Sequence, residues 1–138
     1  MDRRSNRHRA VIGRTLLLIV LLGAQFSAPA QNKSQRVRFQ TGRSSITLRG
    51  RIVGFDARDY VVGAKAGQEM NVHLASSNPS AYFVVYTING KPTDMNETTD
   101  WSLHTVESGD YVIRVFMMRS AARRKGATAN YALTISIH

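Results

Sequence analysis

The sequence predicts an all-β protein: an antiparallel β-sandwich of about eight short strands in a single domain. From Arg36 onward, apolar and polar residues alternate with a period of two almost throughout, which is the spacing of an extended strand. Turn-forming residues separate these runs, as in antiparallel sandwiches and barrels. The inward-facing apolar set, at about 1.5–3 kcal/mol per large buried side chain, is sufficient to offset the chain's ordering entropy without disulfides.

The individual strands follow from this alternation. In the second one, Gly50 falls on the apolar side and indicates a β-bulge. The turn at residues 66–67 predicts a hairpin between its two flanking strands. The run 82–88 is apolar on both faces, which is typical of an interior strand, whereas the acidic stretch 93–100 is predicted to be a loop. The predicted strands cover residues 36–40, 46–52, 60–64, 70–74, 82–88, 101–103, 111–118 and 131–137.

The strand over 111–118 leads directly into a cationic loop. Its alternation stops at Arg119, and Arg123, Arg124 and Lys125 follow with no acid among them. Arg119 and Arg123 are four residues apart, so a helical turn over 120–122 would direct both guanidinium groups to the same side. Clustered guanidiniums repel each other unless they meet an anion, and their planar fork suits a carboxylate. The alternative is a loop whose charges are simply solvated.

A second unusual segment is the predicted loop GFDARD, which begins at Gly54. It places Phe55 and Asp56 side by side, an aromatic residue among alternating charges, between two strands. Folding alone does not require these residues, and a solvated loop is again the alternative.

The first thirty residues have the three parts of a secretory signal peptide. Five arginines precede an apolar run over 16–22, and Ala28-Pro29-Ala30 has the small-x-small pattern of a cleavage site. The apolar run is shorter than the roughly 20 residues that cross a bilayer, so no membrane span is expected after cleavage, and a transmembrane anchor is the weaker alternative. The predicted organisation is therefore a signal peptide over 1–30, a flexible mature N-terminus over 31–35 and a β-sandwich domain over 36–138, in a protein of the periplasm or secreted.

The predicted mature chain is basic. Removing residues 1–30 takes away five of the 19 Lys and Arg and one of the 9 Asp and Glu, so the formal charge falls from +10 to +6. Such a domain suits an anionic partner. Nucleic acid is not expected, because the strand tyrosines share faces with aliphatic residues and are predicted to be core instead of a stacking platform. These tyrosines are Tyr60, Tyr82, Tyr111 and Tyr131.

Catalytic and metal-binding patterns are weak. The chain has no cysteine, so thiol catalysis is excluded. Neither His73 nor His104 has an acidic or hydroxyl residue at a spacing typical of a catalytic pair, so both are interpreted as solvated strand residues. No His-x-His, HExxH or EF-hand pattern occurs. We therefore expect no enzyme, no cofactor and no metal.

Several stretches together resemble the periplasmic inhibitors of goose-type (g-type) lysozyme. The GFD turn combined with MRSAARRK is the most specific pair, whereas the AKAGQ and SGDY turns also occur in bacterial pre-peptidase C-terminal domains. The stretches are VRF at Val37, GFDARDYVVGAKAGQ at Gly54, SGDYVIRV at Ser108, MRSAARRK at Met118 and YALTISI at Tyr131.

The resemblance implies a β-sandwich that inserts loops into the substrate cleft of a g-type lysozyme and blocks it. The family's two arginine positions fall on Arg119 and Arg123, and its aromatic–aspartate pair falls on Phe55 and Asp56. We count Arg124, in the same block, with the partner-binding residues. The family often has Tyr where this chain has Phe55. Homodimer formation is left open. The alternative function is that of a pre-peptidase-type module that binds carbohydrate or the cell envelope without inhibition.

Overall fold

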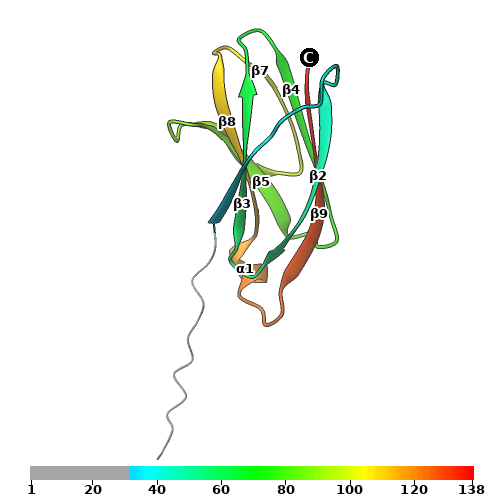
Figure 1. Cartoon of the computed structure of the whole chain (residues 1–138). Coiled ribbons are helices and arrows are strands. Elements are labelled where there is room, and N and C mark those ends of the chain that lie inside the picture. Colours follow the sequence, from blue (N-terminus) through cyan, green and yellow to red (C-terminus); the bar gives the residue numbers. More distant parts are fainter. Residues whose placement is uncertain (1–31) are drawn as a thin grey trace, which may run out of the picture.

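Two β-sheets face each other across a hydrophobic core in the computed structural model, which describes residues 32–138 except the side chains of residues 94–96 (Figure 1). The all-β sandwich is confirmed, with more strands than the predicted eight. The five-stranded sheet has the order β1 (Asn32–Arg36), β3 (Ala57–Ala64), β8 (Gly109–Met117), β5 (Ala81–Thr87), β6 (Pro92–Thr98). The four-stranded sheet has the order β2 (Ser45–Val53), β9 (Thr128–Ile137), β4 (Glu69–Ser76), β7 (Asp100–His104). A single helical turn, α1 (Arg119–Ala122), follows β8.

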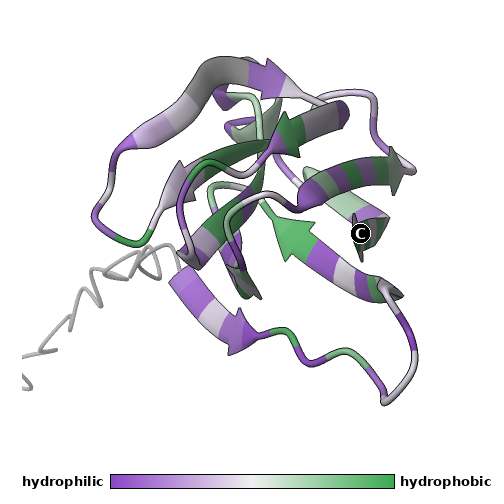
Figure 2. Cartoon of the chain, turned by 90° about the horizontal axis from the view of Figure 1, so that it is seen from above, coloured by the Kyte–Doolittle hydropathy of each residue, from purple (hydrophilic) through white to green (hydrophobic). Residues whose placement is uncertain are grey.

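The core lies between the inner faces of the sheets, as the alternation predicted. Hydrophobic and hydrophilic residues alternate along the strands (Figure 2). The inner-face residues of β8 are all buried, namely Tyr111, Ile113, Val115 and Met117. Tyr60, Tyr111 and Tyr131 are core residues as predicted. The prediction was wrong for Tyr82, which lies half-buried on the other face of β5 because that strand is apolar on both faces.

One hydrogen bond joins the two sheets inside this core. The hydroxyl groups of Tyr60 on β3 and Tyr131 on β9 are 2.7 Å apart and buried. Burial, reinforced by this hydrogen bond, raises the pKa of Tyr131 above that of a free tyrosine. The neutral phenol is therefore the form that the fold requires.

The predicted bulge at Gly50 is wrong. Strand β2 pairs with β9 in unbroken antiparallel register, and Gly50 lies opposite Tyr131. A Cβ atom at Gly50 would be 2.4 Å from the Tyr131 hydroxyl oxygen and 2.5 Å from its Cζ. Glycine is needed there because the tyrosine ring occupies the space of a side chain.

The predicted hairpin around residues 66–67 is also wrong. Strand β3 lies in the five-stranded sheet and β4 in the other, so this turn carries the chain from one sheet to the other. The buried Thr105 holds the crossover, because its hydroxyl donates to the main chain at Lys65 or Gln68 and accepts from the Gln68 amide. A turn signal predicts the reversal of the chain, but not whether the two strands pair.

At the N-terminus the strand begins earlier than predicted. Residues 32–35 were expected to be flexible, yet they form most of β1, which pairs with β3 in parallel. All five β1 residues are exposed, so no apolar alternation marks the strand. Residues 37–40, predicted to be strand, are a connection in which Val37 is nevertheless buried. The predicted signal peptide, residues 1–30, lies outside the described residues.

The acidic stretch 93–100, predicted to be a loop, contributes to β6 and β7. Strand β6 is an edge strand whose pairing with β5 shifts register twice. An irregularly paired edge strand needs no regular apolar alternation, so the sequence of β6 carries no period-two signal. In the part of the chain that the structure describes, no helix has the length and apolar character to cross a membrane.

Arg36 fixes the end of β1 to β8, two strands away in the same sheet. Its guanidinium donates two hydrogen bonds to the carboxylate of Asp110, at 2.7 and 2.8 Å. These bonds, helped by the charge of Arg36, lower the pKa of Asp110. A carboxyl whose pKa is lowered by folding stabilises the fold above its unfolded pKa of about 3.9 and loses that contribution as the pH falls through the folded value.

We therefore expect Asp110→Asn to have a lower Tm than the wild type at pH 7, and the difference to close as the pH drops below about 3.9. Thermal unfolding followed by circular dichroism between pH 7 and pH 2.5 measures it. A Tm difference that stays constant over this range would show that the ion pair contributes nothing to stability.

Candidate partner-binding site

Helix α1 lies at the lower end of the sandwich in Figure 1, between β8 and β9. Its turn is closed by the amides of Ala121 and Ala122, which donate to the Met118 carbonyl at 3.0 and 2.9 Å. Both alanine side chains are buried. Because the alanines occupy the core side of the turn, Arg119 and Arg123 are exposed on the solvent side. The structure thus has the helical turn on which the same-side arrangement of the two arginines was conditional.

The loop of Phe55 is held against this helix. The Gly54 amide donates to the Ala127 carbonyl at 2.9 Å, and Gly54 adopts a φ of 55°, which favours glycine. A Cβ atom at Gly54 would be 3.6 Å from the Ala122 carbonyl oxygen, so the two loops are in close contact. The Asp56 amide closes the turn by donating to Val53 at 3.0 Å.

Three predicted site residues meet here. Phe55, Arg119 and Arg123 line one open hollow at this end of the molecule, although more than sixty positions separate Phe55 from the arginines. The Phe55 side chain is 57% exposed, so it presents an apolar ring to solvent in the same hollow as the two arginines. We call this the Phe55 hollow.

The other two predicted residues lie apart from it. Asp56 lines a separate hollow together with Lys33, Arg51 and Arg58. Arg124 is exposed and lines neither hollow.

Neither Arg119 nor Arg123 forms an ion pair with a carboxylate of the described chain. Three of the protein's acids are engaged by other side chains. Asp59 binds Arg114 through two hydrogen bonds of 2.7 and 2.8 Å on the outer face of the five-stranded sheet. Asp110 binds Arg36, and Asp100 binds His73. The two site guanidiniums are therefore available to an external anion.

The His73–Asp100 contact corrects the sequence interpretation of a histidine without a nearby acid. Their side chains meet at 2.5 Å because β4 and β7 pair His73 directly with Asp100. The contact lowers the pKa of Asp100, chiefly through the hydrogen bond from His73. Both side chains are exposed, and among the described residues no cluster of three or more His, Cys, Asp or Glu that could hold a metal ion is found.

Sequence reasoning missed the cluster of Lys33, Arg51 and Arg58. Lys33 fell in the segment expected to be flexible, Arg51 was taken for an ordinary polar-face residue, and Arg58 was placed in the predicted loop GFDARD. Only the parallel pairing of β1 with β3 brings Lys33 to this place, and nothing in the local sequence indicates that pairing.

No protein-family model and no curated protein matches the sequence. Among solved structures, the crystal structure of Aeromonas hydrophila PliG, a periplasmic lysozyme inhibitor of g-type lysozyme, superposes with a TM-score of 0.71 at 30% identity, covering 79% of this chain and 99% of that one. The chain belongs to the PliG family. This confirms the resemblance drawn from the sequence.

Two further PliG structures also match this chain. Salmonella Typhimurium PliG has a TM-score of 0.59 at 25% identity, covering 77% of this chain and 98% of its own. A mutant of Escherichia coli PliG has a TM-score of 0.59 at 29% identity, covering 79% of this chain and all of its own. Both are described as periplasmic inhibitors of g-type lysozyme.

Proposed function

We propose that this PliG-family protein is a periplasmic or secreted inhibitor of a g-type lysozyme. The observation that carries the proposal is the Phe55 hollow, in which an exposed aromatic ring accompanies two guanidiniums that have no carboxylate partner in the described chain. Family membership supports it, since the PliG structures with the same fold are described as inhibitors of that enzyme.

The chemistry of the target matches these residues. Glycoside hydrolases such as lysozymes work with carboxyl groups in their clefts. A guanidinium inserted among them makes charge-assisted, bidentate hydrogen bonds, which are stronger where water is excluded. In this proposal Arg119 and Arg123 enter the acidic cleft and Phe55 packs against its wall.

Asp56 and Arg124 take supporting roles. In this proposal Asp56, which follows Phe55 in the same turn, meets a cation at the edge of the cleft. Arg124 adds positive charge beside the helix and favours approach to an acidic surface. The protein acts by occupying the cleft, without catalysis and without a cofactor, and residues 1–30 direct it out of the cytoplasm.

The test is to mix the purified protein with a g-type lysozyme and, separately, with chicken-type lysozyme, and to follow the clearing of a cell-wall suspension. We expect loss of the g-type activity and little effect on the chicken-type enzyme. Full activity of both enzymes would overturn the proposal. Binding to the glycan without inhibition would instead favour a carbohydrate-binding module.

A further inference from the structure

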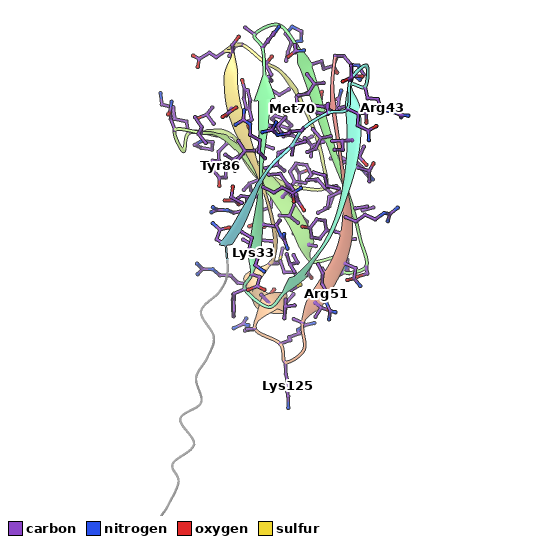
Figure 3. The ribbon with its side chains drawn as sticks, viewed as in Figure 1. Lys33, Arg43, Arg51, Met70, Tyr86 and Lys125 are labelled. Carbon is purple, nitrogen blue, oxygen red and sulfur yellow. The ribbon has the colours of Figure 1, made fainter. Side chains whose placement is uncertain are left out.

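The second hollow lies where the edges of the two sheets meet. It is lined by residues from β1, β2 and β3, with Lys33, Arg51 and Arg58 as its cations and Asp56 as its acid. Lys33 comes from β1 and Arg51 from β2, which are the edge strands of opposite sheets. Figure 3 shows Lys33 and Arg51 in the lower half of the molecule, the half that also carries Lys125. We call it the Lys33 hollow.

The charges of the Lys33 hollow are not balanced within it. None of its three cations forms an ion pair with a carboxylate in the described part of the chain. Lys33 and Arg58 are direct partners in the β1–β3 pairing, and like charges opposite each other on paired strands are destabilising. Three cations against one acid make this a place where an incoming anion relieves repulsion.

The position of Lys33 is fixed by contacts on both sides of it along β1. Asn32 donates to Asp59 at 3.3 Å, and Arg36 binds Asp110. These contacts belong to the outer face of the sheet, so the alternation of β1 directs Lys33 to the opposite face, beside Arg58. The backbone that carries Lys33 is held in place before any ligand arrives, which reduces the entropy lost on binding.

The turn over residues 54–56 joins the two hollows. Phe55 lines the Phe55 hollow, and the next residue, Asp56, lines the Lys33 hollow. A partner seated on Phe55, Arg119 and Arg123 therefore extends over the neighbouring cations. We propose that the Lys33 hollow is a second anchoring site, which receives an acidic side chain from the rim of the lysozyme cleft.

This inference rests on the proposed function, and charge-matched variants separate the two. The double variant Lys33→Glu/Arg51→Glu reverses two exposed charges of the Lys33 hollow. The control Arg43→Glu/Arg49→Glu makes the same change in net charge at exposed residues that do not line the hollow. Arg49 lies on β2 two positions before Arg51, and Arg43 lies at the opposite end of the molecule (Figure 3).

Surface plasmon resonance with immobilised g-type lysozyme measures binding, and thermal unfolding verifies that both variants are folded. We expect Kd to rise at least tenfold for the hollow variant relative to the control, with a weaker dependence of the association rate on salt. Equal Kd values for the two variants, with wild-type inhibition intact, would overturn this inference and leave the proposed function standing. A wild-type protein that neither binds nor inhibits the lysozyme would overturn both.

Discussion

Arg119→Ala is expected to weaken inhibition of a g-type lysozyme at least tenfold, and Arg123→Ala to do the same. Removing one member of a desolvated charge pair costs roughly 2–5 kcal/mol, and tenfold corresponds to about 1.4 kcal/mol. Both arginines are exposed, so their truncation leaves the core intact. Inhibition constants from cell-wall lysis, together with Tm values, provide the measurement.

Two companion variants sharpen this result. Arg119→Lys keeps the charge but loses the planar fork, so it should inhibit less well than the wild type if a bidentate contact with a carboxylate is made. Arg43→Ala removes a cation at the far end of the molecule and should leave potency unchanged (Figure 3). Unchanged potency in both Arg119→Ala and Arg123→Ala would defeat the assignment of the site.

The sequence could predict which residues face the core, because side-chain alternation is a local property. Alternation alone assigns Val72, Leu133 and Ile135 to the inner face, and all three are buried. Strand pairing is not local, since it depends on which edges meet in space. For this reason the hairpin at residues 66–67 was wrong and β1 was missed.

The candidate site likewise has one part that the sequence indicates and another part that depends on strand pairing. The four-residue spacing of Arg119 and Arg123 indicated that a helical turn would place them on one side, and the resemblance to the family pointed to Phe55. The Lys33 hollow depends on the register of two strands and on the approach of two sheet edges. Its cations are residues that any solvated polar face contains, so only the three-dimensional structure reveals the hollow.

The sequence marks Gly50 as an unusual strand residue, but the reason for a glycine there is visible only in the structure. A glycine inside a strand normally costs about 0.5–1 kcal/mol relative to alanine, so Gly50→Ala would be stabilising on intrinsic grounds. Here the added methyl group would collide with the Tyr131 ring, whose hydroxyl is hydrogen-bonded to Tyr60. Packing therefore predicts that Gly50→Ala destabilises the protein, whereas the intrinsic preference predicts that it stabilises the protein.

We expect Gly50→Ala to lower the free energy of unfolding by about 2–5 kcal/mol, since overpacking and a displaced buried hydroxyl pair both contribute. The matched control is Gly109→Ala, where a Cβ atom meets nothing within 4 Å and φ is not positive. Urea unfolding of both variants measures the difference, with the control at or slightly above wild-type stability. If Gly50→Ala is as stable as Gly109→Ala, the ring of Tyr131 does not need that space and the packing argument is wrong.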